Sequence, residues 1–299
     1  MGIAGDSLTV VPCLFASRRG GKGSLYEFME SQMQKVIVGN VGSWRRGSCV
    51  IESGDALRIR TVSSGAVNSA IETKDRFAGK AAAQKYVRAL DGTAMHRREE
   101  RCIRTALAGV GAGARVLDIP SGTSRLLPLL RQMGFRVVEA DSSPHMIEQG
   151  RQYAERRGIR DGTEFRVEDA FATRFADHSF DAVLCNRLFH HFREPEVRRR
   201  CLCELRRICR GPLIVSFFCS FSFDAVSFHL RHWLRRKAAT DRIPIPLRTF
   251  VADAAAARLK VTRIRMVCPG ISRQWYARLE PTEEGREGSS FFESPRAAG

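Results

Sequence analysis

The stretch "ARVLDIPSGTSRLLPLL", residues 114–130, decides the fold of this chain. Residues of high strand propensity lead into Asp118, a turn of small residues follows, and a leucine-rich segment then takes the spacing of a helix. A strand, a tight turn and a helix in that order commonly hold a ligand at the turn. We therefore expect a ligand site directly after Asp118.

Predicted strands and helices alternate on both sides of this turn. Strand patterns occur at 115–119, 135–140, 163–169, 180–186 and 212–218, and helix patterns at 95–110, 122–133, 144–158 and 194–210. A further helix and strand are predicted within 248–267. Short strands separated by helices of ten or more residues indicate a parallel sheet with helices on both faces. We expect an α/β fold of the Rossmann-like, doubly wound type.

The alternation does not extend over the whole chain. Residues 1–70 show no pattern that can be assigned to a fold, and we treat them as an N-terminal extension of unknown fold. The predicted domain covers residues 71–280. The final segment, 281–299, is polar and rich in Gly and Pro, and this composition predicts disorder.

The composition is that of a globular protein. The apolar fraction of 43% is ample for a core, and no apolar run approaches the length of a membrane span. The formal net charge is +17, but the 42 Arg and 7 Lys are dispersed along the chain, so nucleic acid is not the favoured partner. The nine Cys are irregularly spaced, and no cluster of His, Cys or Asp has the spacing of metal ligands. We expect reduced cysteines, no metal and a cytoplasmic location.

Acidic and amide side chains follow four successive predicted strands. They are Asp118, Asp141, Asp169 and Asn186. Because the carboxyl ends of parallel strands meet at one edge of a sheet, we expect these side chains to line one cleft there. A single loop carboxylate is ordinary, whereas its recurrence at successive strand ends predicts a binding site.

The turn after Asp118 is unsuited to a dinucleotide. A dinucleotide-binding turn has three glycines, and here their positions hold Pro120, Gly122 and Arg125. Pro120 also removes an N–H donor that a pyrophosphate would need. An acidic rim fits a phosphate-free ligand with ribose hydroxyls, an adenine amine and a positive charge, and S-adenosylmethionine has all of these. Asp141 lies 23 residues after Asp118, near the separation expected for an acid that binds ribose.

Four motifs then give the segment from 72 to 280 a specific resemblance to a known family. "VLDIPSGTSR" (116–125) resembles the first motif, VLDxGCGTGR, of the class I S-adenosylmethionine-dependent methyltransferases, in particular of the small-molecule branch called methyltransferase type 11 or UbiE-like. "VVEADSSPHMI" (137–147) resembles the second motif. "VEDAFATRFADHSFDAVLCNRLFHHF" (167–192) resembles the adenine loop and fourth strand, and "CELRRICRGPLIVSFF" (203–218) resembles the helix and fifth strand.

This resemblance implies a seven-stranded, mostly parallel sheet, closed by "SRQWYARLE" (272–280), and a role for each strand-end residue. Asp118 and the turn would hold the methionine end of the cofactor, Asp141 the ribose hydroxyls, and Asp169 the adenine amine. Asn186 would offer its backbone carbonyl to the cofactor's ammonium. The cofactor-binding residues implied in this way are Asp118, Pro120, Ser121, Gly122, Asp141, Ser142, Met146, Asp169, Ala170 and Asn186.

A version of the first motif with Pro in place of its first Gly, PCGTGR, is common, and from that version the chain departs at two positions. Ser121 stands where Cys is usual, and Ser124 stands where a Gly lets helix and cofactor approach each other. Because both serines are small, we expect weakened cofactor binding at most. A degenerate site without catalysis stays open as the alternative.

The sequence "NRLFHHF" (186–192) contains the candidate base. His190 and His191 follow the fourth strand, where the acceptor pocket of this family opens. A His could deprotonate a hydroxyl or phenol acceptor near neutral pH. The alternative is that the pair only packs or caps the junction between loop and helix.

Residues 219–245 form an unusual insertion, with a predicted helix within 223–237. Five apolar residues fall on one face of this helix: Phe223, Val226, Leu230, Trp233 and Leu234. Basic residues crowd its end. The helix could be a lid over the acceptor pocket, the more ordinary outcome for an apolar stripe. It could instead make peripheral contact with an anionic membrane that holds a lipid substrate.

The leading hypothesis is a methyltransferase that moves a methyl group from S-adenosylmethionine to O, N or C of a small-molecule or lipid-like acceptor by in-line displacement. The main alternative is a non-catalytic protein that keeps this fold, in which the altered turn and the basic surface would serve an interaction. The positive charge suggests an RNA methyltransferase, but the sequence contains neither an N/D-P-P-Y/F acceptor motif nor an RNA-binding module with stacking aromatics.

Overall fold

The computed structural model describes residues 69–79, 93–236 and 241–282. The predicted extension lies outside these ranges up to residue 68, and the predicted disordered tail lies outside them from residue 283, so both stay predictions. The described residues all belong to one compact unit.

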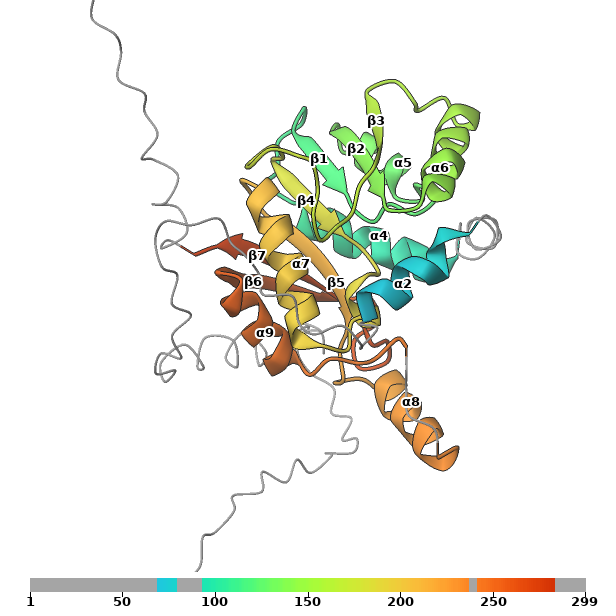
Figure 1. Cartoon of the computed structure of the whole chain (residues 1–299), viewed down its shortest axis with the longest axis vertical. Coiled ribbons are helices and arrows are strands. Elements are labelled where there is room, and N and C mark those ends of the chain that lie inside the picture. Colours follow the sequence, from blue (N-terminus) through green and yellow to red (C-terminus); the bar gives the residue numbers. More distant parts are fainter. Residues whose placement is uncertain (1–68, 80–92, 237–240, 283–299) are drawn as a thin grey trace, which may run out of the picture. The chain divides into compact units, whose positions relative to one another are not determined.

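A seven-stranded sheet forms the centre of this unit (Figure 1). Its order is β3-β2-β1-β4-β5-β7-β6, in which β1 to β5 run parallel and β7 is antiparallel to both of its neighbours. The strands are β1 (Arg115–Asp118), β2 (Arg136–Asp141), β3 (Thr163–Val167), β4 (Ala182–Cys185), β5 (Leu213–Phe218), β6 (Leu259–Met266) and β7 (Gln274–Pro281). The predicted Rossmann-like, mostly parallel sheet of seven strands is confirmed.

The described residues form seven α-helices, and all but the first lie close to predicted positions. They are α2 (Ser69–Ala78), α4 (Ala94–Ala106), α5 (Leu127–Gln132), α6 (Pro144–Arg156), α7 (Pro195–Ile208), α8 (Phe223–Leu234) and α9 (Leu247–Ala256), with a 3-10 turn, η1 (Phe189–His191). One helix, predicted at 122–133, is shorter than expected and begins at Leu127. Gly122 and Ser124 have φ values of 57° and 61°, which a right-handed helix cannot contain, so this part of the chain stays in turns.

Strand β5 shows that helices cover both faces of the sheet. Ile214 belongs to the buried cluster that includes the inner face of α4, whereas Phe217 stacks on Phe250 of α9 with ring centroids 4.0 Å apart. Because side chains alternate between the faces of a strand, these two residues lie on opposite sides. Figure 1 shows the same arrangement, with α7 and α9 in front of the sheet and α4 behind it.

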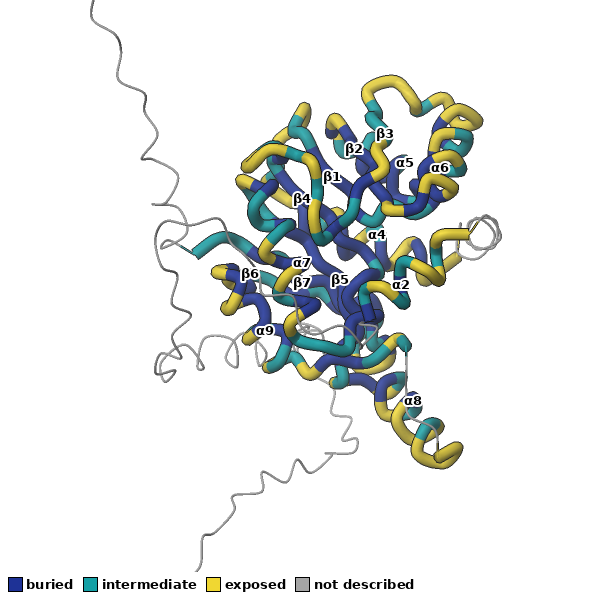
Figure 2. Tube along the Cα trace, in the orientation of Figure 1, coloured by how far each residue is buried: buried dark blue, intermediate teal, exposed yellow. Residues whose placement is uncertain are grey.

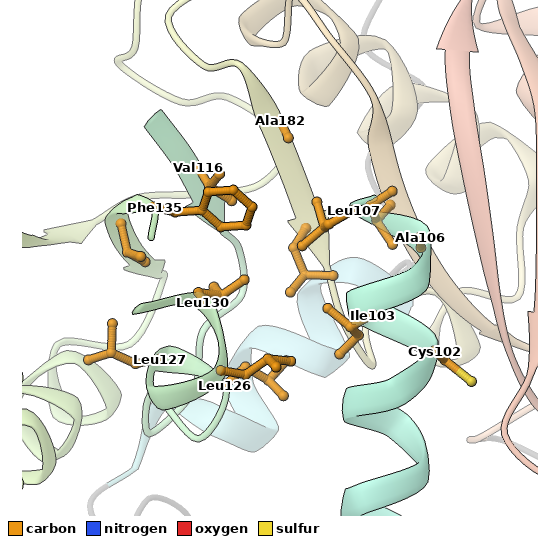
Figure 3. Packing of buried hydrophobic residues seen from close by; sticks show 14 of the residues in the cluster. Cys102, Ile103, Ala106, Leu107, Val116, Leu126, Leu127, Leu130, Phe135 and Ala182 are labelled. Carbon is orange, nitrogen blue, oxygen red and sulfur yellow. The ribbon is translucent and has the colours of Figure 1, made fainter. Parts of the chain in front are cut away.

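The core on the α4 side fixes the turn that follows β1. Ile103 of α4 and Leu107 at the C-terminal cap of that helix pack in one cluster with Val116 of β1 and Leu130 of α5, and all four are fully buried (Figure 3). Burial of each large aliphatic side chain contributes about 1.5–3 kcal/mol. The turn between β1 and α5 is therefore held at both ends by packed elements.

A buried ion pair connects α7 to α9 behind the loop that follows β4. Arg198 Nε donates to Asp253 Oδ2 over 2.7 Å, and both side chains are at most 4% exposed. Arg199 donates to the other oxygen of Asp253 over 2.9 Å. Arg198 also donates to the backbone carbonyl of Phe192 over 3.0 Å, so this ion pair helps to place the loop between β4 and α7.

Helix α8 does not bury its apolar stripe. The exposed fractions are 73% for Phe223, 61% for Val226, 51% for Leu230, 74% for Trp233 and 65% for Leu234. Ala225 and Phe228, on the other face, are buried and attach the helix to the domain. Figure 2 accordingly shows most of the far end of α8 as exposed, in contrast to the strands of the sheet. The usual burial of such a stripe is not found here.

Candidate functional site

A cleft opens at the carboxyl ends of β1, β2 and β4, where the strand order reverses. Its empty volume is about 950 Å³, counting space that is open to solvent. All ten residues predicted to bind the cofactor line it: Asp118, Pro120, Ser121, Gly122, Asp141, Ser142, Met146, Asp169, Ala170 and Asn186. The structure thus brings the strand-end residues together in the predicted place. The described residues of 219–236, which include α8, do not line the cleft.

Asp141 holds the turn after β1 in place. Its Oδ2 accepts a hydrogen bond from the backbone N–H of Gly122 over 3.0 Å, and its Oδ1 accepts one from the N–H of Ser143 over 2.9 Å. A carboxylate offers about four lone-pair positions, so the group can still accept from a ligand hydroxyl. Burial raises the pKa of Asp141 to about 6, although these two hydrogen bonds act to lower it.

Two more acids are buried beside this turn. Asp118 ends β1, Glu139 is its register partner on β2, and both are at most 1% exposed. Burial raises the pKa of Asp118 well above its usual range, and the charge of Glu139 raises it further. Asp118 Oδ1 has no hydrogen-bond partner among the described residues. A buried carboxylate oxygen of this kind at a cleft is suited to a ligand that brings a cation or an N–H donor.

Glu139 is a site residue that sequence reasoning missed. It stands where the family's second motif, VxGxDxSxxMI, has a Gly, and burial raises its pKa to about 8. The side chains of Ser124 and Ser121 lie close enough to act on that pKa, in the lowering direction. The two serines that depart from the first motif and the acid that departs from the second therefore lie together.

Ser124 also has a close neighbour on α6. It is fully buried, and a Cβ added at Gly150 would lie 2.3 Å from its Oγ. Gly150 therefore makes room for the hydroxyl that this chain carries in place of a Gly at position 124.

Helix α2 covers the cleft from the side opposite the sheet. The residues that it contributes to the lining are Ala70, Thr73, Lys74 and Phe77. Lys74 forms an ion pair with Asp169, the residue expected at the adenine amine. Glu72 on the same helix accepts two hydrogen bonds of 2.9 Å from Arg193, in the loop before α7. This wall was not predicted, because residues 71–79 carry no motif of their own.

Asn186 is held by its side chain. Its Oδ1 accepts hydrogen bonds from the hydroxyls of Ser216 and Tyr276, each over 3.0 Å. The side-chain oxygen is thus occupied by these two hydroxyls, and Asn186 also lines the cleft.

Two arginines line the same cleft and meet on one buried acid. Arg125 Nη2 donates to Glu99 Oε2 over 3.0 Å, and Arg187 donates to the other oxygen of Glu99. Glu99 belongs to α4 and is fully buried. Sequence reasoning gave no role to Arg125 or Glu99, because their pairing joins segments that are far apart and carry no spacing signal.

The structure separates the two candidate histidines. His190 is buried, stacks on Phe218 with ring centroids 4.0 Å apart, and does not line the cleft, and burial lowers its pKa well below the usual value. His191 does line the cleft, and its Nδ1 lies 2.5 Å from Asp241 Oδ1. Asp241 also pairs with Arg76 of α2 over 2.6 Å. Although burial acts to raise the pKa of Asp241, its contacts with His191 and Arg76 hold it low. The prediction for His190 is thus corrected to a packing role.

The other features of residues 69–79, 93–236 and 241–282 that bear on chemistry are possible metal ligands, cysteines and membrane-spanning helices. In these ranges, no three His, Cys, Asp or Glu side chains are grouped as ligands for a metal ion. The cysteines described are free thiols, and most are buried. None of the described helices combines the length and apolar character needed to cross a membrane.

Several proteins with similar sequences are named as methyltransferases. Residues 117–212 match the sequence profile of a methyltransferase domain. The chain is 35% identical over 107 residues to phosphatidylethanolamine N-methyltransferase of Cereibacter sphaeroides, which covers 36% of this chain and 51% of that protein. It is 37% identical over 111 residues to demethylmenaquinone methyltransferase of Thermus thermophilus, covering 36% and 48% respectively. The chain thus spans about half the length of these curated relatives.

Solved structures share the fold at low sequence identity. Magnesium protoporphyrin IX methyltransferase from Synechocystis, with bound S-adenosylhomocysteine, has a TM-score of 0.56 at 13% identity, covering 72% of this chain and 100% of that one. Mitomycin 7-O-methyltransferase has a TM-score of 0.55 at 18% identity, covering 68% and 58%. At these identities the similarity establishes the fold.

Proposed function

We propose that this chain, whose residues 117–212 form a class I methyltransferase domain of the UbiE-like type, moves a methyl group from S-adenosylmethionine to a small-molecule or lipid-like acceptor. The convergence of the strand-end residues in one cleft is the observation that supports this most directly. The activity is the one for which the curated relatives are named, and it suits an acidic cleft without a phosphate-binding turn.

The side chains in the cleft fit this cofactor. Asp118 has a buried oxygen without a hydrogen-bond partner among the described residues, and this oxygen could accept a hydrogen bond from the ammonium of the cofactor. Asp141 keeps capacity to accept from ribose hydroxyls, and Asp169 lies at the mouth where the adenine amine is expected. S-adenosylmethionine supplies a methyl group activated by its sulfonium. The protein then needs only to align the acceptor, exclude water and, for some acceptors, remove a proton.

We propose that His191 removes this proton and that Asp241 positions it. A neutral imidazole whose Nδ1–H donates to a carboxylate presents an unprotonated Nε2 to an acceptor hydroxyl. Asp241 is a suitable partner because its contacts with His191 and Arg76 keep it ionised. Positioned proton transfer of this kind typically contributes 10²–10⁴-fold to a rate.

Labelled S-adenosylmethionine tests both proposals. Demethylmenaquinone and phosphatidylethanolamine are the first acceptors to offer, because relatives are named for them. For an acceptor that must lose a proton, His191→Gln should lower the rate by about 10²–10⁴-fold and remove the base's step from the pH profile. Asp241→Asn should shift that step, while cofactor binding is kept. An unchanged pH profile in His191→Gln would show that His191 is not the base. Failure of the wild-type protein to bind the cofactor at high micromolar concentration would contradict methyl transfer itself.

We further propose that α8 brings the enzyme to an anionic lipid surface, where a lipid-like acceptor would be found. Phe221 and Ile271, each 61% exposed, add to the exposed apolar side chains of α8. Arg231, Arg235 and Arg236 are also exposed on α8 and at its end, so a negatively charged surface is complementary to it. Amphipathic helices with this combination bind the membrane interface.

Flotation with vesicles tests the lipid contact. The protein should float with phosphatidylglycerol-containing vesicles and not with pure phosphatidylcholine vesicles, since the basic residues favour anionic lipid. Trp233→Glu should abolish flotation, whereas Val167→Glu, at an exposed apolar position of β3, should not. Absence of wild-type protein from the floated fraction would exclude the membrane role. If the wild-type protein forms a concentration-dependent dimer and Trp233→Glu does not, the exposed face of α8 binds a second copy of the chain instead of a membrane.

A further inference from the structure

The outer face of α4 carries arginines whose charge is not balanced by acids. Arg98, Arg101 and Arg104 are exposed, and none of the three forms an ion pair within the described residues. Arg98 contacts the thiol of Cys268 over 3.7 Å, and Arg104 contacts the side-chain amide oxygen of Gln132 over 3.5 Å. Because arginine stays protonated in proteins, all three side chains keep their positive charge.

The acids of α4 offset little of this charge. Of its two acids, Glu99 is fully buried, so Glu100 alone stands near the three arginines on the outer face. Glu100 Oε1 lies 3.3 Å from the Nε2 of His96 on the same helix. The outer face of α4 therefore has an excess of positive charge.

Two arginines of the sheet extend this charge past the end of the helix. Arg263 of β6 donates to the backbone carbonyl of Thr105 over 3.5 Å, and Arg278 of β7 donates to the carbonyls of Ala106 and Ala108 over 2.8 and 2.9 Å. The last carbonyls of a helix carry a partial negative charge, which these guanidinium groups cover. An anion on α4 would thus meet positive charge at this end of the helix as well.

The arginines on the opposite side of the sheet, where α7 and α9 lie, are arranged differently (Figure 1). Arg198 and Arg199 of α7 share Asp253 of α9, and Arg207 pairs with Glu204. The dispersal of arginine along the sequence argued against nucleic acid as a partner. The fold nevertheless leaves unbalanced arginines side by side on α4.

The composition of this surface favours phosphates over a membrane. Binding at a membrane interface needs apolar side chains that enter the bilayer, in addition to charge. Helix α8 has both, whereas Met95, in the first turn, is the one large apolar side chain exposed among the described residues of α4. Guanidinium groups bind phosphate oxygens through charge-assisted and often bidentate hydrogen bonds, and a nucleic-acid strand presents phosphates in a row.

We propose that the α4 basic face, defined as Arg98, Arg101, Arg104 and Arg263, binds nucleic acid through its phosphate backbone. Neither α4 nor β6 contains a Phe, Tyr or Trp on which a base could stack, so the contact should not depend on base sequence. None of the four arginines lines the cofactor cleft. The inference therefore goes beyond the proposed methyl transfer and does not depend on it.

Fluorescence anisotropy of the full chain with labelled single-stranded oligouridine tests the phosphate contact. For a single strand, the logarithm of the affinity falls with the logarithm of the salt concentration by about 0.7 per phosphate contacted. Arg101→Glu combined with Arg104→Glu should make this slope shallower by about 1.4 and weaken binding at physiological salt by at least about tenfold. Arg200→Glu combined with Arg248→Glu changes the net charge equally, at exposed positions of α7 and α9, and should weaken binding less than about threefold.

Three results would overturn the inference. The first is wild-type protein that does not bind oligouridine at low salt. The second is equal weakening by the two double variants, which would show that net charge and not the α4 basic face attracts the strand. The third is a loss of flotation with anionic vesicles in Arg101→Glu, Arg104→Glu while oligouridine binding is kept, which would assign the face to lipid headgroups.

A milder pair of substitutions covers the case in which the double Glu variant does not fold. Arg101→Gln combined with Arg104→Gln removes the same two charges without reversing them, and circular dichroism checks that the helices are kept. The salt slope should again become shallower by about 1.4. A slope equal to that of the wild type would contradict the phosphate contact.

Discussion

The close approach of Gly150 to Ser124 predicts that Gly150→Ala changes the stability of the protein in opposite directions, depending on whether residue 124 is Ser or Gly. Alanine is about 1 kcal/mol more favourable than glycine inside a helix. In this chain, however, the new Cβ would lie 2.3 Å from Ser124 Oγ, and both residues are buried. Overpacking of this kind costs about 1–3 kcal/mol. Because the helix gain offsets about 1 kcal/mol of this cost, Gly150→Ala should destabilise the protein by about 1 kcal/mol.

Removing the hydroxyl should reverse the result. In a Ser124→Gly background, the closest remaining neighbour of the new Cβ is Phe165 Cε1 at 3.4 Å, an ordinary contact. Gly150→Ala should then stabilise by up to about 1 kcal/mol, so the two substitutions couple by about 2 kcal/mol. Urea unfolding of the wild type, both single variants and the double variant measures this coupling. If Gly150→Ala has the same sign in both backgrounds, the hydroxyl is not what requires the glycine.

Three further predictions concern the cleft and the support behind it. Asp141→Ala should weaken S-adenosylmethionine binding at least 100-fold in calorimetry, because charge-assisted hydrogen bonds to the ribose and the anchor of the turn are both lost; Asp161→Ala, at an exposed position, should leave binding intact. Glu139 has a folded-state pKa of about 8, above its ordinary value of 4.5, so its ionisation opposes folding and stability should fall as pH rises between these values. Glu139→Gln should flatten that part of the profile in thermal unfolding, and a slope equal to that of the wild type would contradict the raised pKa. Arg198→Leu should destabilise by about 3–5 kcal/mol in urea unfolding, because Asp253 stays buried with Arg199 as its remaining cation. Arg200→Leu on the exposed face of the same helix should cost less than about 0.5 kcal/mol.

The sheet could be predicted because its strands carry a strong local signal. Parallel strands buried on both faces are short apolar runs, and every residue of β4 and β5 is buried. The helix after β1 was predicted too long because Ser124 adopts a left-handed φ that ends any helix there, and a serine does not indicate such a φ. The family's first motif has a glycine at this position, and that glycine was the available sign of a left-handed turn.

The cleft residues could be predicted only where the topology places them. Asp118, Asp141 and Asn186 follow parallel strands, and the sheet itself brings such positions together. Glu99 and Asp241 reach the site through side-chain pairing between distant segments. Pairing of this kind leaves no periodicity in the sequence. Asp241 also lies in the insertion, for which the sequence suggested a lid or a membrane contact and not a partner for His191.

Helix α2 precedes the sheet by more than thirty residues, yet Lys74 and Phe77 belong to the cleft. A shortened chain that began at Thr93 would retain every strand of the sheet and the helices packed on it. It would nevertheless leave Asp169 without Lys74 and open one flank of the adenosine end to bulk water. Helix α2 is therefore a part of the cleft wall that contributes nothing to the sheet.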